Sequence, residues 1–184
     1  KPVVIRLFPG TYREDNENVV LDFIENDSIN TLTIEAYDIN NPPVIQPGDT
    51  SRSSSFVVQS SYLTLDHIHF SLAGAYSYYN AGGTRMDGNY ITVRNCCFYR
   101  DPNLPAAEHF RRGTNFGGHH IKIYNCVFYG IFNHGIVVEA SQKTHHIEIV
   151  NHVFIQVARH RFGELWPWTM NGITFWSITP GSVL

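Results

Sequence analysis

Two acidic residues hold equivalent places in two short β-type segments of this sequence. Asp87 and Glu139 occupy that place, and Gly117 occupies it in the segment between them. If the segments stack as neighbouring strands, the two acidic residues lie two rungs apart, or ~9.6 Å, with an open slot between them. Calcium binds hard oxygen ligands, so Asp87 and Glu139 are candidate Ca²⁺ ligands, with Asn115 nearby.

Cationic residues near these segments are candidates for removing a proton. They are Arg85, Arg111, Arg112 and Lys143, and His134 is a further candidate for proton transfer. A cationic side chain acts as a base only where burial or neighbouring charge lowers its pKa, which is easier for Lys than for Arg. Removal of the proton α to a uronate carboxylate, with the ion neutralising that carboxylate, is the β-elimination of a polysaccharide lyase.

Two other functions fit the same residues. Inverting glycosidases need carboxyl groups ~6.5–9.5 Å apart, and Asp87 and Glu139 lie at the upper edge of that range. In the third function, the charges are merely solvated, and the protein binds glycans or builds a surface assembly without catalysis. For each function, the candidate sugar contacts are Asn115, His109, Tyr78 and Tyr79, although the tyrosines could equally pack over the fold.

An eight-residue repeat indicates the elements that position these residues. It occurs as LTLDHIHF from Leu63, ITVRNCCF from Ile91, IKIYNCVF from Ile121 and IEIVNHVF from Ile147. The starts are 28, 30 and 26 residues apart, by subtraction of those numbers. Apolar residues at the first, third and eighth positions, recurring at this period, are typical of a solenoid of stacked strands.

The fifth position of the repeat is His67, Asn95, Asn125 or Asn151. Asn tolerates the bent backbone of a corner, and its amide can donate to one counterpart and accept from another. The sequence therefore predicts an asparagine ladder at one corner of the solenoid.

A second set of strands precedes the repeats, and alternation assigns its two faces. The residues predicted to point inward are Phe56, Val58, Met86, Phe116, Ile136, Val138, Ile173 and Phe175. One outward column contains Val57, Arg85, Asn115, Val137 and Thr174, and the next contains Gln59, Asp87, Gly117, Glu139 and Trp176. Long connections at 71–83, 100–112, 130–134 and 155–171 fall at one corner, which favours the neighbouring outward face as the binding face.

Three strands per coil, an Asn corner between the second and third, and long connections before the first resemble the right-handed parallel β-helix of the pectate-lyase-like superfamily. PGTYRE from Pro9 and TIEAYDINNPPVI from Thr33 are similar to the entrance coils of secreted members. The resemblance implies an all-β protein of about six coils with three strands each. It also implies a substrate groove along the outward face described above, although no subfamily's catalytic signature is intact.

The domain organisation expected is a single β-helix over 1–184, with entrance coils at 1–55, regular coils at 56–154 and a last coil at 155–184. Composition agrees, because 43% hydrophobic and 16% charged residues are typical of one compact domain. No apolar run approaches the ~20 residues needed to cross a bilayer. A formal charge of -3 without a Lys/Arg cluster argues against a nucleic-acid partner. The mixture of Arg and acidic residues on the outward face suits an acidic polysaccharide, which is the expected partner.

The first and last residues of the sequence lead to two further expectations. Residue 1 is Lys and no secretory segment precedes it, so we expect an excised or mature piece of a secreted, extracellular or periplasmic protein. The last stretch ends after a strand with no evident polar cap, which predicts truncation or self-association through the last coil.

Two further patterns have alternative interpretations. Cys96 and Cys126 share the sixth repeat position, so they form either a buried thiol stack or a disulfide between rungs. Two consecutive repeats are preceded by a His pair where earlier repeats have Tyr62 or Tyr90. The pairs are His119 with His120 and His145 with His146. An aromatic stack is favoured, and capture of Zn²⁺ or Cu²⁺ is the alternative.

Overall fold

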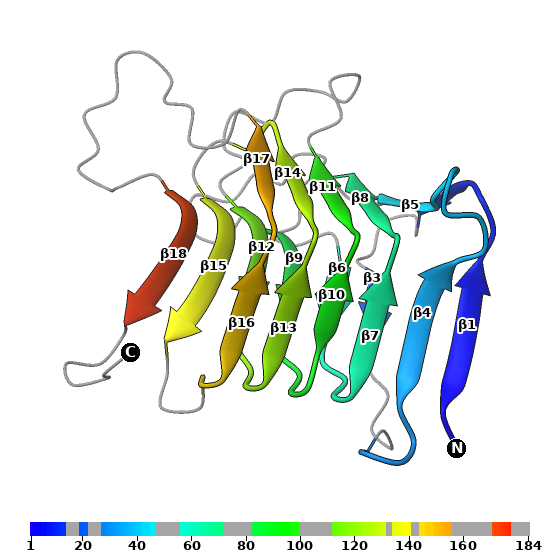
Figure 1. Ribbon diagram of the computed structural model, residues 1–184, viewed down its shortest axis with the longest axis horizontal. Helices are drawn as coiled ribbons and strands as arrows, with labels where there is room; N and C mark the ends of the chain where they lie inside the picture. The colour runs from blue at the N-terminus through cyan, green and yellow to red at the C-terminus, as the bar shows by residue number, and fades with distance from the viewer. Residues whose placement is uncertain are drawn as a thin grey trace.

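The computed structural model describes residues 1–13, 19–21, 27–46, 56–71, 82–99, 112–131, 134–140, 144–155 and 171–177. The regular secondary structure in these ranges consists entirely of β-strands, which form three parallel six-stranded sheets (Figure 1). None of the described residues forms a helix long and apolar enough to span a membrane. The predicted all-β fold class is confirmed.

The chain visits the three sheets in turn, so each strand pairs with the strand three places later. Sheet A contains β1 (Val3–Leu7), β4 (Leu32–Ala36), β7 (Leu63–Asp66), β10 (Thr92–Arg94), β13 (Ile121–Tyr124) and β16 (Ile147–Val150). Sheet B contains β2 (Thr11–Arg13), β5 (Val44–Gln46), β8 (His69–Ser71), β11 (Cys97–Tyr99), β14 (Val127–Tyr129) and β17 (Val153–Ile155). Sheet C contains β3 (Val19–Leu21), β6 (Phe56–Val58), β9 (Gly82–Met86), β12 (Arg112–Phe116), β15 (His134–Ala140) and β18 (Asn171–Ser177).

The four copies of the repeat supply the last four strands of sheets A and B, and their apolar positions form much of the core. Phe70, Phe98, Phe128 and Phe154 at the eighth position stack with ring centroids 4.8, 5.0 and 5.1 Å apart. The apolar residues at the first and third positions of the first three repeats are fully buried beside them. Sheet C closes the core with its predicted inward residues, which are buried from Phe56 to Val138. The side chain of Phe175 and the predicted uncapped end lie outside the described residues.

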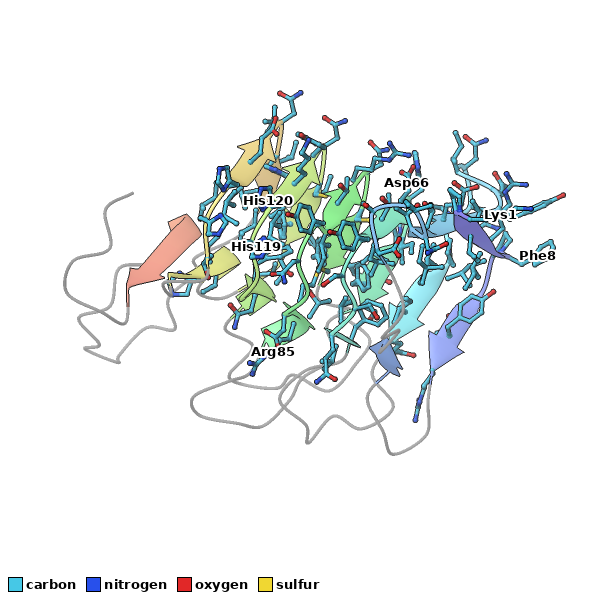
Figure 2. The ribbon with its side chains drawn as sticks, turned by 90° about the horizontal axis from the view of Figure 1, so that it is seen from below. Lys1, Phe8, Asp66, Arg85, His119 and His120 are labelled. Carbon is cyan, nitrogen blue, oxygen red and sulfur yellow. The ribbon has the colours of Figure 1, made fainter. Side chains whose placement is uncertain are left out.

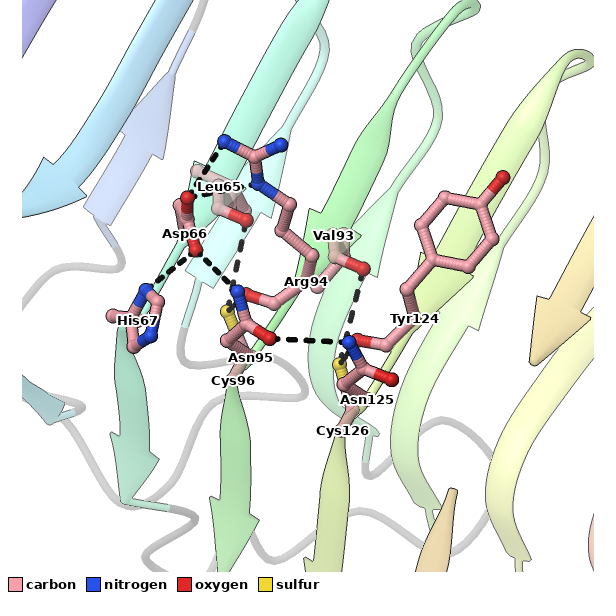
Figure 3. Close-up of polar contacts among 10 residues, drawn as sticks. All are labelled: Leu65, Asp66, His67, Val93, Arg94, Asn95, Cys96, Tyr124, Asn125 and Cys126. Carbon is pink, nitrogen blue, oxygen red and sulfur yellow. Dashed lines mark hydrogen bonds and ion pairs between the residues drawn. The ribbon is translucent and has the colours of Figure 1, made fainter. Parts of the chain in front are cut away.

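The predicted asparagine corner is present between sheets A and B. His67, Asn95, Asn125 and Asn151 all have left-handed φ values of 51 to 56°. Asn125 Nδ2 donates to Asn95 Oδ1 at 3.3 Å, which confirms the ladder between these two residues (Figure 3). Such backbone is tolerated best by Asn among residues with a side chain, which explains the residue type.

The ladder ends on a carboxylate. Asn95 Nδ2 donates to Asp66 Oδ1 at 2.9 Å, and His67 Nδ1 lies 2.6 Å from the same oxygen. Arg94 approaches Asp66 Oδ2 with Nε at 2.8 Å and Nη2 at 2.7 Å. Asp66 is therefore a buried acid with partners on two rungs, a network that we did not predict from the variable fourth position of the repeat.

The cysteines next to this corner are free thiols. Cys96 Sγ lies 3.8 Å from the Leu65 carbonyl oxygen, and Cys126 Sγ lies 3.8 Å from that of Val93, one rung back in each case (Figure 3). Of the two alternatives left open by the sequence, the structure has the buried thiol stack.

Candidate functional site

The outward face of sheet C has the register predicted from the sequence. Val57 pairs with Arg85, Arg85 with Asn115, Asn115 with Val137, and Val137 with Thr174. The residues of this column differ in their access to solvent. Asn115 is 7% exposed and Val137 is fully buried, whereas Arg85 is exposed. Asn115, predicted to line an open groove, is thus covered, and Arg85 is the charged group of the column that reaches solvent.

Arg85 forms an ion pair with Asp87 at the end of its own strand. Its Nε lies 2.7 Å from Asp87 Oδ2, and the two side chains are 48% and 32% exposed. The backbone N–H of Asp87 donates to the Val58 carbonyl at 2.8 Å, which fixes the acid to the preceding rung. The pair therefore stands on rigid strand backbone with both charges accessible from outside.

The second outward column carries the two acidic positions. Gly117 N donates to the Met86 carbonyl at 3.0 Å, just as Asp87 N donates one rung earlier. Phe116 pairs with Val138, so Glu139 follows in register with Gly117 and is itself paired with Trp176. The backbone thus places Asp87, Gly117 and Glu139 on successive rungs as predicted, while the Glu139 side chain lies outside the described residues.

Two glycines hold the turns after these positions in close contact. A Cβ on Gly88 would lie 1.8 Å from the Ser60 carbonyl oxygen, and one on Gly118 would lie 2.0 Å from that of Gly88. Only glycine permits this approach, so the stacked turns fix Asp87 and Gly117 relative to one another. Thr144 Oγ1 adds a hydrogen bond to the Gly117 carbonyl at 3.3 Å.

The described part of this column does not by itself fit calcium. Calcium takes six to eight oxygen ligands, and the described side chains of the column provide one carboxylate, Asp87, which is already paired with Arg85. A bound ion would have to displace the guanidinium and recruit Glu139 as well.

The candidate proton-transfer residues fall in different places. His134 is 5% exposed and shares the inward alternation of Ile136 and Val138. It pairs with Arg112 at the start of the strands, three residues before Val137, which is ~10 Å along the strand. The structure therefore does not bring His134 beside Arg85 and Asp87. The Arg112 side chain and the whole of Arg111, Lys143, His109, Tyr78 and Tyr79 lie outside the described residues.

Aromatic rings stack at the corner that leads from sheet C to sheet A, as predicted. Successive centroids of Tyr62, Tyr90, His120 and His146 are 4.6, 4.5 and 4.4 Å apart, with interplanar angles of 5, 20 and 12°. All four residues have left-handed φ values of 53 to 56°, which the sequence did not indicate because the column begins with two tyrosines, and Tyr is unusual in that conformation. The sequence did predict the column itself, because each of the four aromatic residues directly precedes one copy of the repeat.

The three sheets, the asparagine corner and the connection order together define a parallel β-helix. Among solved structures, the crystal structure of pectate lyase Pel9A matches this fold with a TM-score of 0.59 and 16% sequence identity. The match covers 81% of this chain and 38% of that chain, so this chain spans well under half the length of its structural neighbour. No protein-family model matches the sequence, and no curated protein is significantly similar to it. The likeness confirms the resemblance in fold.

Proposed function

We propose that the protein is a secreted, carbohydrate-active β-helix protein that cleaves an acidic, uronate-containing polysaccharide by β-elimination. The observation that supports this proposal is the exposed ion pair of Arg85 and Asp87 on the outward face of sheet C. A guanidinium binds carboxylates with two parallel hydrogen bonds, so Arg85 can exchange Asp87 for a uronate carboxylate of the substrate. Its pairing suits Arg85 to this binding role better than to proton removal.

Lys143 is the proposed base. An ammonium group loses its proton more readily than a guanidinium when its surroundings disfavour charge. In sequence, Lys143 directly precedes Thr144, which donates to the Gly117 carbonyl between the two acidic positions. The base takes the proton α to the carboxylate, the C–H electron pair forms a C=C bond, and the glycosidic oxygen leaves the β carbon and is protonated. Arg111 and Arg112 are the alternative proton-transfer residues.

A calcium ion at the acidic column is a separable part of the proposal. Asp87 and Glu139 would hold it on either side of Gly117, and when bound it would neutralise the substrate carboxylate. Calcium should then raise the melting temperature of the protein, and Asp87→Ala and Glu139→Ala should each reduce that rise. Arg85→Gln frees the Asp87 carboxylate and should increase it. If neither acidic variant changes the calcium-dependent melting, the ion proposal fails.

Incubation with polygalacturonate, alginate and glycosaminoglycans tests the reaction type. β-Elimination gives an unsaturated product that absorbs in the ultraviolet, and a calcium-dependent reaction loses that signal in EDTA. New reducing ends without unsaturated product would instead identify hydrolysis, with Asp87 and Glu139 as the carboxylate pair.

The second candidate function is non-catalytic glycan binding. It is favoured by the mutual neutralisation of Arg85 and Asp87 and by the burial of Asn115 and Val137 beside them. Retention on an immobilised acidic glycan, without release of any product, would identify this function. Light scattering of the same sample tests the predicted self-association through the last coil.

A further inference from the structure

Four imidazole rings form a two-by-two array at the corner between sheets C and A. His119 and His120 come from one rung, and Figure 2 shows them beside one another and apart from Arg85. His145 and His146 come from the next rung. The His119 and His145 rings stack at 4.8 Å and 3°, and those of His120 and His146 stack at 4.4 Å and 12°.

Within each rung the two rings face one another through their Nδ1 atoms. The His119 and His120 Nδ1 atoms are 2.8 Å apart, and those of His145 and His146 are 2.5 Å apart. Ligand atoms of His119, His120 and His145 all lie within 4.8 Å of one another. In such a pair of neutral imidazoles, one Nδ1–H donates to the other Nδ1, and a shift of the donor ring to its Nε2–H tautomer leaves both Nδ1 lone pairs for a metal ion. The array therefore converges nitrogen donors from two rungs.

Backbone hydrogen bonds hold the array in position. His119 N donates to Asn89 Oδ1 at 3.1 Å, and His120 N donates to the His145 carbonyl at 3.0 Å. Ile121 N donates to the His146 carbonyl at 3.1 Å. The rings are thus carried by paired backbone, and a ligand would meet donors that are already placed.

Packing alone does not require these histidines. The two preceding rungs have Ser61 with Tyr62 and Asn89 with Tyr90 at the same places, and Tyr62 and Tyr90 stack just as closely. Both later rungs replace the tyrosine and its neighbour with histidine. The replacement adds nitrogen donors on two adjacent rungs. Such donors are not needed for ring stacking, because Tyr62 and Tyr90 stack without them.

We propose that His119, His120, His145 and His146 form a binding site for a late first-row transition-metal ion, with Cu²⁺ preferred over Zn²⁺. Metal–nitrogen bonds of ~2.05 Å put adjacent donors ~2.9 Å apart at 90° and ~3.3 Å apart at the tetrahedral angle. The His119–His120 Nδ1 separation of 2.8 Å is close to the first value, which belongs to the tetragonal arrangement that Cu²⁺ takes, and nitrogen donors generally bind Cu²⁺ more tightly than Zn²⁺. The site is independent of the Arg85–Asp87 pair and of the proposed lyase reaction.

Titration of the purified protein with Cu²⁺ and with Zn²⁺, by calorimetry and electron paramagnetic resonance, tests the proposal. We expect one Cu²⁺ per chain, imidazole nitrogen couplings in the resonance spectrum, and weaker binding of Zn²⁺. The matched variant is His119→Asn, His120→Tyr, His145→Asn and His146→Tyr together, which gives both rungs the Asn–Tyr pair of Asn89 and Tyr90. It keeps the aromatic stack and should bind Cu²⁺ about a hundredfold more weakly.

Two further variants keep the test decisive. The pairs His119→Asn with His145→Asn and His120→Tyr with His146→Tyr each remove half of the donors and should each weaken binding about tenfold. His69→Gln lies outside the array and should bind Cu²⁺ as the unchanged protein does. Undetectable or only millimolar Cu²⁺ binding by the unchanged protein, or undiminished binding by the folded variants of the array, would overturn the proposal.

Discussion

Asn95 donates its side-chain amide to Asp66 Oδ1 at 2.9 Å, and the asparagine ladder thereby ends on a buried carboxylate. Arg94, from the same rung as Asn95, approaches the other carboxylate oxygen at 2.7 and 2.8 Å. A buried acid is stable only when it is paired and hydrogen-bonded. At the corner between sheets A and B, the Asp66 carboxylate is therefore the shared partner of Asn95 and Arg94.

Asp66→Asn should destabilise the protein by about 1–3 kcal/mol, because it removes the charge that pairs with Arg94 and accepts from Asn95. Urea unfolding followed by circular dichroism measures the change. The control is Glu35→Gln, which removes an exposed ion pair with Arg6 and should cost no more than about 1 kcal/mol. Equal losses from the two variants would show that Asp66 does not have this role.

The contribution of Asp66 to the free energy of unfolding should depend on pH. Burial by itself would raise the pKa of Asp66, but hydrogen bonds from Asn95 and Arg94 and the charge of Arg94 outweigh it and hold that pKa below 3.8. A carboxyl whose pKa is lower in the folded state stabilises the protein fully above its unfolded pKa, and this stabilisation is lost as the pH falls through the folded pKa. The stability difference between the unchanged protein and Asp66→Asn should therefore be constant above about pH 5 and shrink below pH 3.8. A difference that grows on acidification would contradict the pairing.

The three cysteines should react with iodoacetamide only after unfolding. Cys96 and Cys126 are at most 1% exposed, and burial raises the pKa of Cys97 to about 11, so little reactive thiolate is accessible near neutral pH. Mass spectrometry should find no alkylation of the native protein. It should find three alkylated cysteines in denaturant without reductant. Fewer than three in that second sample would reveal a disulfide that the structure does not have.

The sequence predicts the fold well because burial acts on single residues at a fixed spacing. The first, third and eighth positions of the repeats, from Leu63 to Phe154, are apolar because their side chains enter the core. This can be read from each repeat separately. Partners between rungs are harder to predict, since the pairing of Asp66 with Arg94 depends on register and not on residue type alone. Asp66 and Arg94 both stand at the fourth position of the repeat, where the residue type varies from copy to copy, so the sequence alone did not indicate their pairing.

Alternation along the strands of sheet C predicts part of the candidate site and not the rest. Alternation correctly assigned Arg85, Asn115 and Val137 to the outward face of sheet C. It gives the direction of a side chain and not what covers it, so the burial of Asn115 was not foreseen. His134 was chosen for its chemistry, whereas its alternation with Ile136 places it on the inward side.

The most direct test of the proposed lyase face on sheet C compares two exposed ion pairs on different sheets. Arg85→Ala with Asp87→Ala removes the pair on sheet C, and Arg6→Ala with Glu35→Ala removes a similar pair on sheet A. The measurement is the rate of ultraviolet-absorbing unsaturated product from acidic polysaccharides. We predict product from the unchanged protein and from the sheet A variant, and at least a tenfold lower rate from the sheet C variant. No product from the folded, unchanged protein, or equal rates from the two variants, would contradict the proposed lyase face.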